Sequence, residues 1–131
     1  MNPPLLAAGT LALVGAAVHG LGGELLVVRE LSPRTLPPSR FGGSSMTKAM
    51  IQASWHMTTV AFVSLGILEL YAATVSGGAG RGAEVIAAGT FTAFAAVAVA
   101  AGHSRLPRVL LRHPGPVLLA TVAGLAWSGS L

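Results

Sequence analysis

Two histidines inside long apolar stretches are the residues of this sequence best placed to do chemistry. His19 lies in the first stretch and His56 in the second. Ionisable side chains are costly inside a membrane and usually have a function there. An imidazole can exchange protons near neutral pH or ligate iron, so the pair defines the centre of a candidate site.

Further polar side chains accompany His56. At 100° per residue of an α-helix, Gln52 shares the side of His56, Thr59 lies about 60° from it and Trp55 about 100° aside. These three residues are predicted to line the site, although Trp55 is also interpreted as a packing residue or interface anchor. On the first stretch, His19 shares its side with mostly small residues, which allow a neighbouring helix to approach closely.

Glu24 is the acidic residue nearest to His19 in the sequence. A regular α-helix places residues five apart about 140° from one another, so the two side chains share a face only if the intervening glycines distort the helix. We expect Glu24 to lie one or two turns closer to the cytoplasm, at the level of Lys48 and Gln52. There it is a candidate proton site.

Composition indicates that lipid is the natural solvent of the chain. Of its 131 residues, 53% are hydrophobic and only 9% are charged, against about 25% charged in soluble domains. The chain has no cysteine and no aspartate, which excludes thiolate metal sites, iron–sulfur clusters and covalently attached haem. The net charge of +4 comes from basic residues in short loops between apolar stretches, so nucleic acid is not an expected partner.

The apolar pattern predicts an all-α integral membrane protein with four transmembrane helices. The predicted spans cover residues 5–28, 46–74, 83–101 and 114–131, in a single transmembrane domain of residues 1–131. Glu69 is near the outer end of the second span and is expected to be solvated.

The basic residues predict the orientation of these spans. The loops after the first and third spans carry four and three Lys or Arg residues, whereas the loop after the second carries only Arg81. Positively charged loops stay on the cytoplasmic side. The prediction is an up-down-up-down bundle with both termini outside, multi-pass in a bacterial cytoplasmic (inner) membrane.

Depth along the spans places the two histidines at a similar level. With a rise of 1.5 Å per residue, His19 lies roughly 4 Å and His56 roughly 5–6 Å to the cytoplasmic side of the midplane. If the first two spans are antiparallel neighbours, the two imidazoles meet, with Gln52 and Thr59 above and below.

Several roles for this cluster remain open. Both histidines can be neutral and hydrogen-bonded, holding helices together at about 0.5–2 kcal/mol per contact. They can instead be axial ligands of a non-covalent haem b, although tight packing of small residues works against a macrocycle. A quinone- or proton-linked site using His56 or Glu24 is a further hypothesis, and the angle of Glu24 counts against a metal site with both histidines.

The residues His19-Gly-Leu-Gly-Gly-Glu24 in the first span and Trp55-His56 in the second carry a resemblance. The chain resembles small bacterial four-span membrane proteins of about 130 residues whose function is unassigned, and this resemblance implies no activity. Its size is also similar to that of small multidrug-resistance exporters, which use a glutamate in the first helix. Glu24 lies near the interface instead of mid-span, so the transporter is the weakest hypothesis.

The favoured interpretation is a non-catalytic accessory or structural subunit, without a cofactor, in contact with lipid and with other membrane subunits or copies of itself. Four spans rich in glycine and alanine offer close-packing surface, and no soluble catalytic apparatus is present. The alternatives are a redox module that binds haem b or a quinone at His19 and His56, and a small proton-coupled transporter.

Overall fold

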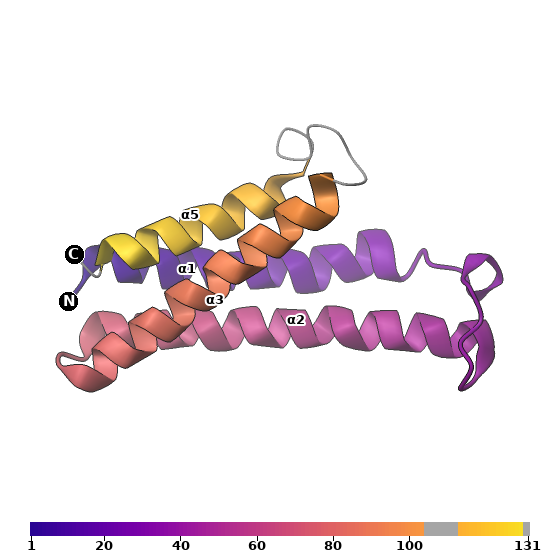
Figure 1. The fold of residues 1–131 in the computed structure, drawn as a ribbon, viewed down its shortest axis with the longest axis horizontal. Helices are drawn as coiled ribbons and strands as arrows, with labels where there is room; N and C mark the ends of the chain where they lie inside the picture. The colour runs from indigo at the N-terminus through magenta and orange to yellow at the C-terminus, as the bar shows by residue number, and fades with distance from the viewer. Residues whose placement is uncertain (104–112, 130–131) are drawn as a thin grey trace. The chain divides into compact units, whose positions relative to one another are not determined.

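The chain is helical throughout its long apolar stretches. In the computed structural model, which describes residues 1–103 and 113–129, the four long helical segments have the following bounds (Figure 1). They are α1 with its π-helical continuation (Pro3–Val28), α2 (Gly43–Thr74), α3 (Gly78–His103) and α5 (Pro114–Gly129). Both α1 and α5 begin at a proline. Proline suits the first turn because it has no backbone N–H, and an N–H at that position would have no partner within the helix.

Three of these helices are long and apolar enough to cross a membrane: Pro3–Val28, Gly43–Thr74 and Gly78–His103. The prediction of an all-α protein is therefore confirmed, and three of the predicted spans correspond to helices with the length and composition to cross a membrane. The fourth helix, α5, has 16 residues, which is about 24 Å of helix. That is shorter than the roughly 30 Å hydrocarbon core of a bilayer.

The helices form two compact units, each with its own contacts. Unit 1 comprises Met1–Leu13 and Ser64–Leu131, and unit 2 comprises Val14–Val63. Each of the first two helices therefore contributes one part to each unit.

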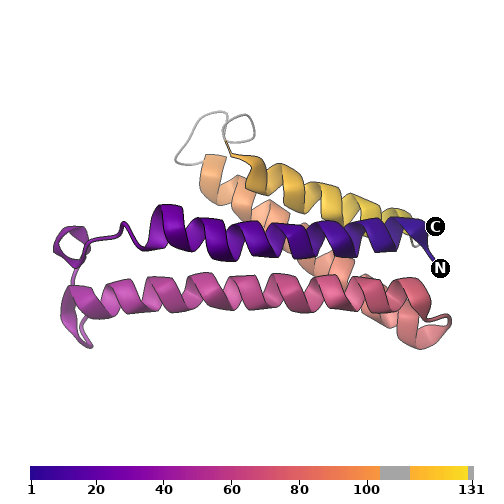
Figure 2. The same ribbon diagram turned by 180° about the vertical axis from the view of Figure 1, so that it is seen from behind.

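In unit 1, small residues let the helices approach closely. A Cβ atom added at Gly9 of α1 would lie 2.8 Å from the carbonyl oxygen of Gly66 on α2, so the two backbones approach closely at this point. Figure 2 shows α1 running beside α2. On the other side of the unit α3 packs along α5, and the indole N–H of Trp127 donates to the Thr92 hydroxyl at 3.1 Å. The buried core is built mainly from alanines, together with Leu5, Phe91, Leu119 and Val122.

Asn2 joins the ends of three helices in unit 1. Its side-chain oxygen accepts from the amide of Leu5 at 3.3 Å and so caps α1, while its side-chain amide donates to the carbonyl of Gly129 at 2.7 Å. Its backbone N–H donates to the carbonyl of Ala73 in α2 at 2.9 Å. One polar residue thus satisfies backbone groups at the ends of α1, α2 and α5.

Two glutamates are buried in unit 1, and one of them corrects a prediction. Glu69 was expected to be solvated near the end of its span, but its side chain is completely buried. It lies on the same side of α2 as Ala72 and Ala73, which also face the core. Glu84 of α3 is nearly as buried and lies 3.8 Å from the guanidinium of Arg81.

Unit 2 is an antiparallel helix pair closed by a loop. The second part of α1 with its continuation runs beside the first part of α2 (Figure 1), and residues 29–42 connect them. Ser39 and Gly43 exchange two backbone hydrogen bonds of 3.0 and 3.1 Å at the start of α2. Gly43 has a φ of +68°, a conformation that glycine adopts at no steric cost.

Candidate functional site

The first helix changes its winding where it carries the candidate residues. Regular α-helix ends at Ala17 and is followed by two π-helical turns, Val18–Gly22 and Glu24–Val28. The stretch contains three glycines, which have low helix propensity. In a π-helix each residue bonds to the fifth residue along, which brings residues five apart closer to one face. His19 and Glu24 have that spacing, so the distortion that would align them is present.

The Glu24 carboxylate receives two side chains from α2. The side-chain amide of Gln52 donates to one oxygen at 3.2 Å, and the Nε2 atom of His56 lies 3.2 Å from the other. Gln52 and His56 are four residues apart and therefore occupy the same face of α2. Glu24 thus lies at the level of Gln52, and it also contacts His56.

His19 has a different set of partners. Its Nδ1 atom is 2.9 Å from the hydroxyl of Thr59, and that hydroxyl is 3.2 Å from the carbonyl of Trp55. When the Thr59 hydroxyl donates to this carbonyl, the hydroxyl oxygen of Thr59 accepts a hydrogen bond from the Nδ1–H of His19. The Nε2 atom of His19 is then a free acceptor.

Trp55 contacts both the backbone and the ring of His19. Its indole N–H donates to the His19 carbonyl at 2.9 Å, and the two rings stack with centroids 4.4 Å apart at an angle of 10°. The Phe62 ring is inclined at 66° to the same imidazole, with the two ring centroids 5.4 Å apart. The helices come this close because Gly23 lies under the Trp55 ring and Gly20 under the Thr59 side chain, where a Cβ atom would collide.

The predicted residues therefore gather on one helix pair, but as two linked groups. Glu24, Gln52 and His56 form one, and His19, Trp55 and Thr59 form the other. His19 lies within hydrogen-bonding distance of Thr59, and His56 lies beside the carboxylate of Glu24. Within residues 1–103 and 113–129, no three His, Cys, Asp or Glu residues are arranged to hold a metal ion.

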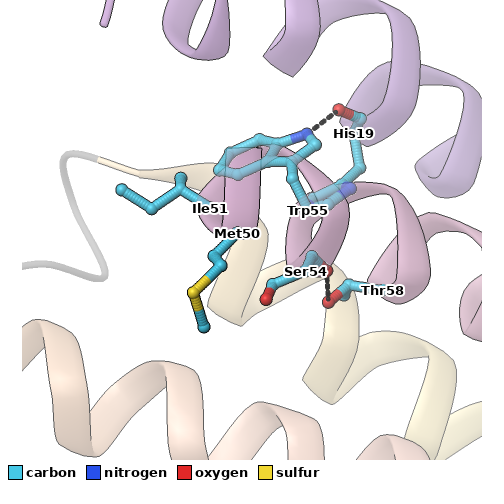
Figure 3. A pocket seen from close by; sticks show the side chains of 6 residues that line it. All are labelled: His19, Met50, Ile51, Ser54, Trp55 and Thr58. Carbon is cyan, nitrogen blue, oxygen red and sulfur yellow. Dashed lines mark hydrogen bonds between the residues drawn. The ribbon is translucent and has the colours of Figure 1, made fainter. Parts of the chain in front are cut away.

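A pocket of about 490 Å³ opens beside the second group (Figure 3). Its lining residues are His19, Met50, Ile51, Ser54, Trp55 and Thr58. Figure 3 shows the indole of Trp55 and the side chain of His19 bordering the space, with Met50 and Ile51 on α2 completing an apolar wall. A pocket with mainly apolar walls and a few polar groups suits a small organic ligand.

Phe62 and four of the residues that line this pocket were not among the predicted site residues: Met50, Ile51, Ser54 and Thr58. Phe62 follows Trp55 by seven residues, and this spacing puts both on one side of α2. That periodicity could have identified Phe62. The pocket residues lack such a signal, because apolar and hydroxyl side chains occur throughout the spans.

Comparisons with protein-family models, with curated proteins and with solved structures found no match to this chain. The resemblance to small four-span bacterial proteins stays a prediction.

Proposed function

We propose that this chain is a non-catalytic subunit of a larger assembly in a bacterial cytoplasmic membrane, docked through the side of α2 that carries His56. The observation that supports this role is the exposure of His56. Its side chain is 46% exposed although it is paired with Glu24. The exposed part of a polar side chain in this position can form hydrogen bonds, and lipid offers no partner for them.

The depth of His56 strengthens the argument. The residue lies 13 positions after the start of α2 at Gly43, which is about 20 Å along the helix. Ionisable side chains inside membranes generally face a protein interior or a water-filled cavity instead of lipid. A second membrane subunit, or another copy of this chain, would supply that protein surface.

The proposal includes four spans with both termini outside. The loop after α1 carries Arg29, Arg34 and Arg40, whereas the turn between α2 and α3 has only Arg81 close to it. This bias supports a cytoplasmic first loop. For α5 to cross as well, its 16 described residues need local thinning of the bilayer or flanking residues at the interface.

Site-specific photo-cross-linking in native membranes tests the docking. A photoreactive amino acid at Val60, about 40° from His56 around α2, should cross-link to a second polypeptide of defined mass. The same probe at Ser54, about 160° from His56, is the matched control and should cross-link to no second polypeptide. The product at Val60 should fall severalfold when His56→Ala is introduced. A product that is confined to lipid or to the chain's own helices, or that does not respond to His56→Ala, overturns the proposal.

A second candidate function rests on the pocket beside Trp55: binding of a quinone head group. Stacked His19 and Trp55 rings border a pocket with apolar walls (Figure 3), and a planar quinone ring could lie against such a surface. Either a hydroxyl in the pocket or a protonated imidazole could donate to its carbonyl oxygens. Haem b is less favoured because both imidazoles already have partners, Thr59 for His19 and Glu24 for His56.

Purification in mild detergent separates the two ligands. A bound quinone predicts that lipid-soluble quinone co-purifies with the chain and is lost in Trp55→Leu, while the visible spectrum stays featureless. A Soret band that disappears in both His19→Ala and His56→Ala would establish haem instead. Absence of both ligands leaves the docking role alone.

A further inference from the structure

A buried carboxyl group in unit 1 has no role in the site described above. Both oxygens of Glu69 are inaccessible to solvent, and neither has a hydrogen-bonding partner among the described residues. The helix positions one turn before and after it are Gly66, Ala72 and Ala73, which are buried and apolar. Glu69 is therefore an acid set in an apolar core.

An ionised carboxylate is unfavourable in such a place. Moving a charge out of water costs several kcal/mol, and the cost is recovered only through hydrogen bonds or a nearby opposite charge. The basic side chain of the adjacent helix segment, Arg81, is paired with Glu84. The segments of α1 and α5 in this unit contain no titratable side chain, and the α-amino group of Met1 belongs to a residue that lines the pocket at the α2–α3 turn. A neutral acid, by contrast, needs no counter-ion.

A pocket that water can enter lies in the same unit as Glu69. A pocket of about 310 Å³ lies at the turn between α2 and α3, and Asn2, Ala72, Ala73, Arg81 and Glu84 are among its lining residues. Gly80 of α3 packs against the carbonyl group of Val75, which follows the end of α2, and a Cβ atom added at Gly80 would lie 3.7 Å from the Ala72 carbonyl oxygen. Glu84 follows Gly80 by four residues along α3, and Glu69 precedes Ala72 by three residues along α2, so each carboxyl group is one helical turn away from this contact.

We infer that Glu69 is a proton-binding site inside unit 1. Its proton exchanges with water in the pocket at the α2–α3 turn, and Glu84 relays the proton between them. The ligand is the proton itself, held as a carboxylic acid in the apolar core. Glu84 suits the relay because it lines the pocket and is nearly buried. This site is separate from the Glu24–His56 pair, and its existence does not depend on the docking proposed above.

Infrared spectroscopy of the full chain in lipid tests the inference, because a protonated carboxyl has a C=O stretch distinct from that of a carboxylate. At neutral pH the wild type should show this band, and Glu69→Gln should remove it. Glu24→Gln and Glu30→Gln are matched controls that should keep it. In D₂O the band should shift as the proton exchanges, and Glu84→Gln should slow this shift severalfold.

The results that would overturn the inference are equally specific. A spectrum unchanged by Glu69→Gln would mean that the residue is ionised. Loss of the wild-type band on adding sodium chloride would indicate a metal-cation site instead of a proton site. An exchange rate that Glu84→Gln does not change would show that Glu84 does not relay the proton.

A second measurement covers the case in which Glu69→Gln does not fold. Dicyclohexylcarbodiimide adds to a protonated carboxyl in an apolar environment and leaves a covalent acylurea, with no leaving group. Peptide mapping of the wild type should find this adduct at Glu69 at neutral pH and not at the exposed Glu30. Labelling at Glu30 equal to that at Glu69 would contradict a neutral, buried acid.

Discussion

Single glycines decide how closely the aromatic and hydroxyl side chains of α2 reach the first helix. Trp55 covers Gly23 and Thr59 covers Gly20, so these two positions have no room for a side chain. The indole can then stack on His19 and donate to its carbonyl. A missing Cβ atom is thus what allows the hydrogen bonds of the site to form.

Gly23→Ala should lower stability by about 1–3 kcal/mol, because the added methyl group collides with the Trp55 ring. Gly22→Ala is the control, since a Cβ atom there would meet only Val18 at 4.0 Å. That variant should gain about 0.4–1 kcal/mol through the reduced entropy of the unfolded chain. The measurement is unfolding followed by Trp55 fluorescence in a Trp127→Phe background, and equal effects of the two substitutions would contradict the packing.

The Glu24–His56 pair should show a measurable coupling. A double-mutant cycle with Glu24→Gln and His56→Gln, measured by reversible unfolding in mixed micelles, should give about 0.6 kcal/mol and no more than about 1.7 kcal/mol, as for other polar contacts between membrane helices. The control cycle replaces Glu24→Gln with Glu30→Gln in the exposed loop and should give no coupling. Equal coupling in both cycles would show that the 3.2 Å contact contributes nothing specific.

At the scale of the helices, polar groups act mainly at the ends and at the changes of winding. The π-helical turns after Ala17 bring His19 and Glu24 towards one face of the first helix. At the opposite end of that helix, Asn2 binds backbone groups of three helices. Both features use backbone hydrogen bonding to orient helices whose apolar side chains alone would pack in several ways.

Asn2 substitutions should destabilise unit 1 in steps. Asn2→Asp keeps the cap on the Leu5 amide but loses the donor to Gly129, and we expect a loss of about 1 kcal/mol. Asn2→Ala loses both interactions and should cost about 2–3 kcal/mol. Thr10→Ala, which removes only an exposed hydroxyl bonded within its own helix, is the control. Thermal unfolding in detergent measures the order of stability of these variants. An Asn2→Ala variant as stable as Thr10→Ala would contradict the role of Asn2.

For the whole molecule, the apolar helices and the asymmetric loop charges indicate how the chain lies in a membrane. Three helices are long enough to span it, and the most basic described loop joins the first two. The candidate site and the proposed proton site lie in different units. Their chemistry can therefore be tested separately within one polypeptide.

Cysteine labelling should establish the orientation, because the natural chain contains no cysteine. In intact spheroplasts a membrane-impermeant maleimide should label Ser76→Cys, in the turn between α2 and α3. Phe41→Cys, in the loop between α1 and α2, should react only after the membrane is permeabilised. Both positions are exposed, so accessibility within the protein is matched, and the reverse pattern would invert the proposed topology.

The sequence by itself determined the helical class and the approximate helix bounds. Hydropathy is a property of each residue type and adds along the chain, so the predicted span 46–74 ends where α2 ends, and 83–101 lies within α3. The ionisable and amide residues His19, Glu24, Gln52 and His56 could also be predicted, since each stands out from its apolar neighbours, whereas Ser54 and Thr58 could not.

Only the tertiary structure decided which of these residues contact one another. His19 pairs with Thr59, which is 40 positions away, and His56 pairs with Glu24. The straight-helix angles could not predict these pairs because the first helix changes its winding between His19 and Glu24. Burial of Glu69 likewise depends on the helices packed around it. Side-chain partners and burial depend on the distances between segments that are far apart in the sequence. They therefore cannot be predicted from the properties of a single stretch.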